Sequence, residues 1–320
     1  MSKRGLTKKF TQPDSIVLER PMVTRHYRME WNLDFCVGCQ IGPAVCPKDA
    51  VIHIDGVVED GRLVKKPSVD IDADKCVFCG MCAVICPKNA ISMTINGKPE
   101  IPIVDFEAFP NLVQSTTFDR NLFDWSKKEF VINNCPTQVI SYDEQQDTML
   151  VDEDHCIRCR QCEVASEGAF QVVQPWQGSV TLTTDKCAEG CLACADICPT
   201  RALHIDEQNK LVLADYYCIK CGACMQVCPV KAQYEEIEET IEVYGTSKTI
   251  KRQRMVNRED LPVVVDRWRL RHSDIKSGAW IEALQKMADD KAGAVELDRK
   301  RALKRRDLLK ALVGGDKMLK

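Results

Sequence analysis

Nineteen cysteines, most of them three residues apart, are the residues of this 320-residue chain whose type and spacing could do chemistry. Two runs read Cys-x-x-Cys-x-x-Cys-x-x-x-Cys-Pro, one from Cys76 to Pro87 and one from Cys218 to Pro229. In such a run the first three thiolates bind one [4Fe–4S] cluster, and the cysteine before proline binds the neighbouring cluster. The two runs therefore predict a chain that carries several iron–sulfur clusters.

A third run contains one extra residue and ends in the same way, from Cys187 to Pro199. Because the cysteine before proline serves the neighbouring cluster, this run and the run from Cys218 predict two complete [4Fe–4S] clusters with exchanged fourth ligands. We call the first of them site 4, with the ligands Cys187, Cys191, Cys194 and Cys228. We call the second site 5, with the ligands Cys218, Cys221, Cys224 and Cys198.

The fourth run, from Cys36 to Pro47, carries Gly42 where the third thiolate belongs. Exchange with the run from Cys76 still predicts one complete [4Fe–4S] cluster, site 2, with the ligands Cys76, Cys79, Cys82 and Cys46. Its neighbour, site 1, retains only three thiolates, those of Cys36, Cys39 and Cys86. One iron of a cube at site 1 would therefore lack a thiolate from this chain.

Three interpretations remain open for this incomplete fifth cluster. Three thiolates suit a [3Fe–4S] cluster. A [4Fe–4S] cluster could instead bind water, hydroxide or a non-cysteine side chain at its fourth iron, and Asp34 and Gln40 are nearby in the sequence. A partner subunit could also supply the ligand. An open iron can act as a Lewis acid, but no set of acids and bases accompanies Gly42, so we expect no catalysis there.

The middle of the chain keeps one site and has lost another. A lone Cys-Pro pair stands at 135–136, and a triplet that begins at Cys156 has no fourth cysteine. The exchange rule joins them into one [4Fe–4S] cluster, site 3, with the ligands Cys156, Cys159, Cys162 and Cys135. The four positions of the lost site hold Trp125, Lys128, Val131 and Ser166. With site 3, all nineteen cysteines are assigned once.

Disulfides and structural zinc are poor alternatives for these cysteines. Disulfides are typical of secreted chains, and residues 1–10 lack the apolar stretch of a signal peptide. Zinc sites use Cys-x-x-Cys pairs rather than four-cysteine runs that end in proline. No apolar run has the length needed to span a bilayer, so we expect a soluble, cytoplasmic protein.

The expected fold class is α+β, with tandem bacterial-type 2[4Fe–4S] ferredoxin-like modules followed by a C-terminal, largely helical arm. Each unit of the repeat should comprise a short strand, a cysteine loop, about one helical turn, Cys-Pro and another short strand. We expect the modules to lie in series and to pass electrons in that order. The expected divisions are an N-terminal segment (1–30), module 1 with sites 1 and 2 (31–98), module 2 with site 3 (99–175), module 3 with sites 4 and 5 (176–237) and the arm (238–320).

Charge distinguishes the arm from the modules. Residues 241–320 contain 20 Lys and Arg against 12 Asp and Glu, whereas residues 1–240 contain 24 against 35. Short strands are expected at 240–245 and 261–265, and the apolar spacing over 277–313 predicts a helix. No recognised nucleic-acid-binding motif accompanies the basic residues. We therefore expect the arm to dock on the acidic modules or on a partner subunit.

With these motifs in place, the chain resembles the archaeal polyferredoxins, and among them most the polyferredoxin subunit of formylmethanofuran dehydrogenase. The resemblance covers residues 15–235 and rests on three features of the sequence. They are the stretch 69–80 (VDIDADKCVFCG) with the CPKNAI that follows, the spacer from 95 to 110, and the three-residue gap between Cys187 and Cys191. The chain has ligands for five clusters, fewer than members of that family carry.

The resemblance implies a non-catalytic subunit that carries electrons. It would connect a tungsten- or molybdenum-containing catalytic subunit with a small ferredoxin or another low-potential donor, during anaerobic CO₂ reduction in methanogenesis or its reversal. The Cys-Pro motifs are also shared by polyferredoxins of hydrogenase, heterodisulfide reductase and aldehyde oxidoreductase complexes. A free-standing electron shuttle and an interaction scaffold stabilised by its clusters are further alternatives.

Overall fold

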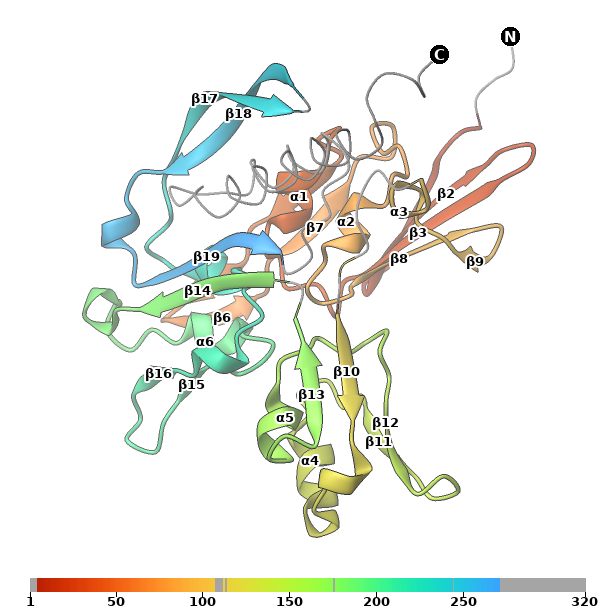
Figure 1. The fold of residues 1–320 in the computed structure, drawn as a ribbon. Helices are drawn as coiled ribbons and strands as arrows, with labels where there is room; N and C mark the ends of the chain where they lie inside the picture. The colour runs from red at the N-terminus through yellow and green to blue at the C-terminus, as the bar shows by residue number, and fades with distance from the viewer. Residues whose placement is uncertain (1–4, 107–111, 113, 175, 244, 271–320) are drawn as a thin grey trace.

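The structure is a computed structural model that describes residues 5–106, 112, 114–174, 176–243 and 245–270 (Figure 1). Within this part, a short helix between two strands recurs along the chain as the sequence predicted. The helix predicted over 277–313 lies outside the described residues.

The three modules share one topology, in which the first strand pairs with the last and the two middle strands pair with each other, all antiparallel. In module 1 these pairs are β3 (His26–Asn32) with β8 (Ile91–Ile95) and β4 (Val51–Ile54) with β7 (Ser68–Ile71). In module 2 they are β10 (Ser115–Phe118) with β13 (Phe170–Val173) and β11 (Ile140–Asp143) with β12 (Thr148–Val151). In module 3 they are β14 (Trp176–Leu182) with β19 (Val263–Leu270) and β15 (Leu203–Ile205) with β16 (Leu211–Leu213).

A short helix follows each cysteine loop or its counterpart. Four of these helices stop at the cysteine before proline, because proline pushes the preceding residue out of the helical region. Cys46, Cys135, Cys198 and Cys228 accordingly have ψ of 115°, 115°, 110° and 128°. The six helices are α1 (Ile41–Val45), α2 (Met81–Val84), α4 (Lys128–Asn134), α5 (Gln161–Ala165), α6 (Ala193–Ile197) and α7 (Ala223–Val227).

The remaining described helices are one turn long and lie in the connections between these elements. They are α3 (Pro102–Asp105) and the 3₁₀ turns η1 (Arg120–Leu122), η2 (Trp125–Lys127), η3 (Thr184–Lys186), η4 (Asp215–Tyr217) and η5 (Arg258–Asp260). No helix among the described residues is both long and apolar enough to cross a membrane.

The N-terminal residues enlarge module 1 rather than preceding it. β1 (Lys8–Thr11), β2 (Ser15–Pro21) and β9 (Lys98–Pro99) extend the β3–β8 pair into a five-stranded sheet of order β1-β2-β3-β8-β9. Alternate residues of β2 and β3 face the core, as expected for strands with one buried face. Leu18 and Met29, for example, are 0% and 1% exposed. Residues 15–30 thus belong to module 1, which differs from the expected division at residue 31.

The beginning of the expected arm also differs from the prediction. Short strands were expected near 240–245 and 261–265, and strands are present, but they are longer and belong to module 3. β17 (Tyr234–Val243) and β18 (Thr246–Met255) form a hairpin, and β19 then pairs with β14. Val263 and Val265 of β19 are buried in the same apolar cluster as Cys194 and Cys224. Residues 234–270 therefore complete module 3 and are not part of a helical arm.

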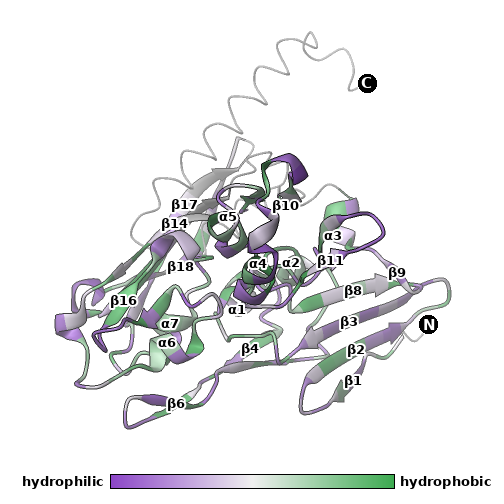
Figure 2. Cartoon of the chain, turned by 90° about the horizontal axis from the view of Figure 1, so that it is seen from below, coloured by the Kyte–Doolittle hydropathy of each residue, from purple (hydrophilic) through white to green (hydrophobic). Residues whose placement is uncertain are grey.

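The three modules meet around their short helices. Figure 1 shows the five-stranded sheet on one side, module 2 below, and module 3 with the β17–β18 hairpin on the other side. Seen from below, the short helices lie toward the middle while β1 to β3 and β15–β16 lie toward opposite edges (Figure 2). A hairpin inserted in module 1, β5 (Val57–Glu59) and β6 (Arg62–Lys65), reaches α6 of module 3.

Candidate metal centres

The third cysteine of each triplet occupies the same local position, the second residue of a short helix. Cys82, Cys162, Cys194 and Cys224 have this position in α2, α5, α6 and α7, and Gly42 has it in α1. A left-handed residue precedes four of these five helices, with φ of 60° at Gln40, 80° at Gly80, 67° at Arg160 and 81° at Gly222. This sharp turn lets the loop and the first helical turn present their sulfurs to one point. Gly42 thus lies where a third thiolate would lie.

The cysteines predicted for sites 4 and 5 line two separate cavities in module 3. The first cavity encloses about 350 Å³ and the second about 340 Å³, including some space open to solvent. The only cysteines lining the first are Cys187, Cys191, Cys194 and Cys228, and those lining the second are Cys198, Cys218, Cys221 and Cys224. The remaining lining is mostly apolar and includes residues of β14 and β19. Each cavity therefore joins a triplet from one run with the Cys-Pro cysteine of the other.

Site 2 has the same construction in module 1. A cavity of about 350 Å³ is lined by Cys46, Cys76, Cys79 and Cys82, together with apolar residues that include Met29 and Phe78. The backbone N–H of Ala50 donates a hydrogen bond to the Cys46 sulfur at 3.2 Å. Such N–H groups stabilise negative charge on the sulfurs and thereby adjust the potential of a bound cluster.

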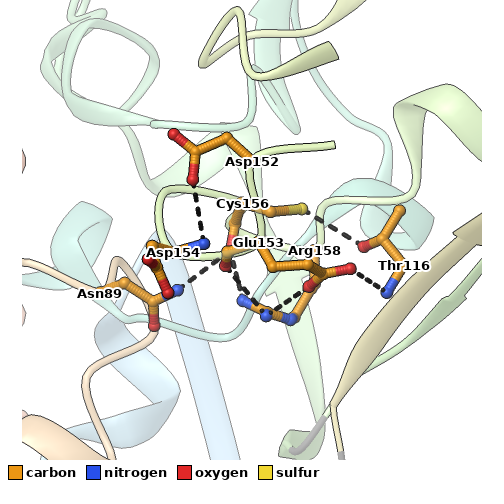
Figure 3. Close-up of polar contacts among 7 residues, drawn as sticks. All are labelled: Asn89, Thr116, Asp152, Glu153, Asp154, Cys156 and Arg158. Atoms are coloured by element: carbon orange, nitrogen blue, oxygen red, sulfur yellow. Dashed lines mark hydrogen bonds and ion pairs between the residues drawn. The ribbon is translucent and has the colours of Figure 1, made fainter. Parts of the chain in front are cut away.

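Site 3 lies in module 2, where the four predicted cysteines are all buried. Burial is the main cause that raises the pKa of Cys159 to about 12, and the neighbouring Cys135 and Cys156 raise it further. Burial raises the pKa of the Cys156 thiol, and the Thr116 hydroxyl, 3.3 Å from its sulfur, opposes that rise (Figure 3). Glu153 holds this threonine in place, because its carboxylate accepts hydrogen bonds from the Thr116 N–H at 2.9 Å and from Arg158 at 2.8 Å.

Aromatic side chains fill the lost half of module 2. Trp125 and Val131, at two of the four non-cysteine positions, pack with Phe118, Phe123 and Phe170 in one apolar cluster. At the other two positions, Lys128 Nζ lies 4.2 Å from the Tyr142 ring centroid, and the Ser166 hydroxyl accepts a hydrogen bond from the Phe170 N–H at 2.9 Å. Side chains thus pack around these four positions, and the loss of a cluster there stays a prediction.

The predicted ligands of site 1 lie in the loop between β3 and α1 and directly after α2. Burial is the main cause that raises the pKa of Cys86 to about 11, and the charge of Cys36 raises it further. A Cβ atom added to Gly42 would meet only Val51 Cγ1, at an ordinary contact distance of 3.5 Å. Of the two substitute ligands considered, Asp34 is exposed and Gln40 is half-buried. All three interpretations of the fifth cluster remain open.

At every site, burial raises the pKa of at least one thiol, and neighbouring cysteines add to the rise. The pKa of Cys194 and of Cys221 rises to about 12, and that of Cys82 and of Cys224 rises well above the usual value. A thiol must lose its proton to bind iron. These cavities therefore suit a cationic iron core that compensates four thiolates. In the described part of the chain, no three Cys, His, Asp or Glu side chains converge as ligands of a single metal ion.

Cysteines of four sites pack into one apolar cluster between the modules. It contains Cys39 of site 1, Cys159 of site 3, Cys191 of site 4 and Cys221 of site 5. Burial is the main cause that raises the pKa of Cys221, and the charge of Cys39 is the next. Module 1 therefore contacts module 3 directly. The order of electron transfer from module 1 through module 2 to module 3 stays a prediction.

Polar contacts hold the three modules around this cluster. Arg62 of the β5–β6 hairpin donates two hydrogen bonds to Asp196, at 2.9 and 2.7 Å, and the Gly61 carbonyl accepts one from Leu192 N–H at 2.8 Å. Between modules 1 and 2, the Asn89 side-chain amide donates to the Cys156 carbonyl at 3.2 Å (Figure 3). The rings of Phe35 and His155 also pack edge to face there, 5.3 Å apart. Sequence reasoning missed these contacts, because no local pattern distinguishes their residues from solvated polar residues.

Comparisons with known proteins agree with the metal-binding interpretation. Residues 69–92 match a family described as 4Fe-4S binding domain, and residues 186–232 match a 4Fe-4S dicluster domain. A curated relative, the polyferredoxin-like subunit of aliphatic sulfonate oxidoreductase from Pyrococcus furiosus, is 36% identical over 67 residues. That alignment covers 21% of this chain and 38% of the relative. The chain thus spans well under half the length of that protein.

A solved structure shares the fold over almost the whole chain. It is a chain of the formate dehydrogenase–heterodisulfide reductase–formylmethanofuran dehydrogenase complex from Methanospirillum hungatei. The TM-score is 0.68 at 20% sequence identity, and the match covers 90% of this chain and 93% of that chain. This likeness shows a shared fold, and the family matches show that the chain contains two [4Fe–4S]-binding domains of the ferredoxin type.

Proposed function

We propose that the chain is an iron–sulfur electron-transfer subunit, a polyferredoxin, of an oxidoreductase complex, and that it has no catalytic activity of its own. One observation carries this proposal: three cavities are each lined by four cysteines that come from two exchanged runs. Clusters held in this way exchange single electrons and need no substrate pocket. Nineteen reduced thiols also require a reducing environment, which favours the cytoplasm.

The residues of this chain would bind the clusters, keep water away from them and adjust their potentials. Nineteen cysteines would hold four [4Fe–4S] clusters and a fifth that is [3Fe–4S] or a [4Fe–4S] cluster with another ligand. Apolar side chains such as Phe78 and Val263 line or surround the cavities. Hydrogen bonds to sulfur, such as those from Ala50 and Thr116, would stabilise the reduced state of the nearest cluster.

For the partner, we favour the tungsten or molybdenum subunit of formylmethanofuran dehydrogenase, with a small ferredoxin or another donor at the opposite end. The sequence features at 69–80 and 95–110 and the fold shared with the Methanospirillum hungatei chain support this partner. A second candidate is an oxidoreductase complex that acts on another substrate. The 36% identity to the sulfonate oxidoreductase subunit of Pyrococcus furiosus favours it.

Anaerobic native purification of the tagged chain, followed by mass spectrometry of every co-purifying subunit, tests the proposal. Co-purification with a tungsten or molybdenum subunit and an amidohydrolase-like subunit would support the formylmethanofuran partner. A different catalytic subunit would support the second candidate. A monomer that reduces and reoxidises reversibly would mean a shuttle, and clusters that do not titrate would refute electron transfer altogether. A chain with Cys76, Cys79 and Cys82 changed to alanine provides the matched control for cluster-dependent transfer.

A further inference from the structure

The connection between the two middle strands is long in module 1 and short in the other two modules. Residues 55–67 join β4 to β7, whereas residues 144–147 join β11 to β12 and residues 206–210 join β15 to β16. The long connection folds into the β5–β6 hairpin. Its turn residues Asp60 and Gly61 have φ of 47° and 74°, as in a two-residue type I′ turn. Module 1 thus carries a projection that the matching connections of modules 2 and 3 do not form.

The tip of this hairpin lies on the backbone of the site 4 cysteine loop. The Gly61 carbonyl accepts a hydrogen bond from the Leu192 N–H at 2.8 Å. A Cβ atom added to Gly61 would lie 2.8 Å from Cys191 Cα, so the two backbones approach as closely as only glycine allows. Cys191 is a predicted ligand of site 4 and closes the loop that contains the extra residue of its run. Module 1 therefore touches the cluster loop of module 3.

The next residue of the hairpin holds the helix that follows this loop. Arg62 Nε and Nη2 donate to the two carboxylate oxygens of Asp196 at 2.9 and 2.7 Å, and the Leu63 N–H donates to the same carboxylate at 3.0 Å. A bidentate arginine–carboxylate pair fixes orientation as well as distance. Asp196 lies in α6 between Cys194 and Cys198, predicted ligands of sites 4 and 5. The hairpin thus holds the segment that carries ligands of both clusters of module 3.

Apolar contacts accompany these polar ones. Val58 and Leu63 of the hairpin pack against the apolar cluster that contains Cys39 of site 1, Cys191 of site 4 and Cys221 of site 5. We call this contact between modules 1 and 3 the junction. An isolated surface ion pair contributes little to stability. Here three hydrogen bonds converge on one carboxylate beside an apolar contact, so their main effect is to fix position.

We propose that Arg62 and Asp196 are positioning residues for electron transfer between modules 1 and 3. The β5–β6 hairpin acts as a clamp that holds α6 and the site 4 loop against module 1, and it thereby fixes the separation between clusters on the two sides of the junction. This proposal rests on the proposed electron-transfer function and deepens it. Each step moves one electron from a reduced cluster to an oxidised one, and no bond is made or broken.

The test compares position and transfer in the full chain with all clusters loaded. Arg62→Ala removes the guanidinium, and Arg62→Lys keeps its charge without the bidentate geometry. Arg28→Ala is the matched control, because Arg28 also donates to two carboxylates, at 2.7 and 2.8 Å, but within the sheet of module 1. Hydrogen exchange of the Leu192 N–H reports the position of the site 4 loop.

Transfer is followed by freeze-quench electron paramagnetic resonance after mixing with less than one equivalent of a low-potential reductant. Proteins with Cys82→Ala and Cys187→Ala identify the signals of sites 2 and 4 by their loss. In Arg62→Ala, the Leu192 N–H should exchange about fivefold faster, the factor for loss of one well-formed, partly exposed ion pair. The rate of transfer between modules should fall from the parent through Arg62→Lys to Arg62→Ala.

Salt separates positioning by charge from a general loss of structure. At about 1 M salt, where the Debye length is about 3 Å, transfer in the parent should slow toward the Arg62→Ala rate, while Arg62→Ala itself changes little. Parent-like exchange and transfer in Arg62→Ala, or equal slowing in Arg28→Ala, would overturn the proposal. If Arg62→Ala does not load its clusters, the parent and Arg62→Lys are compared over the same range of salt.

The outcome is separable from that of the proposed function. If the chain purifies without a catalytic partner but Arg62→Ala frees the Leu192 N–H and slows transfer, the clamp stands and the complex is refuted. If the partner is present and Arg62→Ala behaves as the parent does, the reverse holds.

Discussion

Replacement of Gly42 by cysteine should complete site 1. Gly42 is the second residue of α1, the position that Cys82, Cys162 and Cys194 occupy in their helices. Its backbone does not have a positive φ, and the added Cβ would make an ordinary 3.5 Å contact with Val51. The helix should tolerate the change, since cysteine has a slightly better helix propensity than glycine, by about 0.3 kcal/mol.

The expected size of the effect depends on what site 1 holds. If it holds a [3Fe–4S] cluster, Gly42→Cys should add about one iron per chain and remove the paramagnetic signal of the oxidised three-iron cluster. If it holds a [4Fe–4S] cluster with another ligand, the iron content should remain constant while the spectrum of one cluster changes. Iron and sulfide analysis with electron paramagnetic resonance distinguishes the two results.

Gly42→Ala is the control, because it adds the Cβ atom without a sulfur and should leave the clusters unchanged. The result that refutes the reasoning is a Gly42→Cys protein with the iron content and spectra of Gly42→Ala. The sulfur at position 42 would then not reach the cluster. The assignment of Cys36, Cys39 and Cys86 to one shared site would be wrong in that case.

Three further changes test the sites and the junction. Thr116→Val removes a hydrogen bond to the Cys156 sulfur. The reduction potential of site 3 alone should fall, as measured by redox titration, and the free energy of unfolding in denaturant should decrease by about 1 kcal/mol. Thr116→Ser keeps the hydroxyl and should retain the parent values of both quantities. Gly61→Ala should destabilise the β5–β6 hairpin by about 1–3 kcal/mol, because φ is +74° and the added Cβ would lie 2.8 Å from Cys191 Cα. Site 4 should then lose iron to a chelator faster than in the parent protein. Gly97→Ala is the control, since φ is +77° there but the added Cβ would have no atom within 4 Å. Cys159→Ala should remove the site 3 cluster. Rapid-mixing kinetics should still show electron exchange between modules 1 and 3, and loss of that exchange would contradict direct electron transfer across their contact.

The cysteine sets were the most predictable feature of the protein. Three cysteines within one turn and loop are brought together by local backbone geometry, whatever the rest of the chain does. The exchange of the fourth cysteine follows from the repeat, because the two halves of a module face each other. The lost site in module 2 stays a prediction, and Trp125 and Val131, at two of its four positions, pack in the apolar core of that module.

Module boundaries were less predictable, and β19 shows why. The apolar stretch at 261–265 indicated a strand, but a local pattern does not identify its partner. That partner is β14, and the β17–β18 hairpin separates β19 from the last cysteine run. The insertion made the closing strand of module 3 look like the start of an arm. The contact between modules 1 and 3 was not predicted for a similar reason, because sequence order does not report which modules touch.

The sequence by itself was enough to predict which thiols share a cluster, because ligand spacing within a turn and repetition of the motif are local properties. Tertiary structure alone decided what surrounds those clusters. Lys48 and Lys88 occupy the same position after Cys-Pro, yet one is exposed and the other is buried. The turn that carries Lys88 contacts module 2, because Asn89 donates a hydrogen bond to the Cys156 carbonyl. Packing between distant segments depends on the whole surface of each module, and no local residue pattern encodes it.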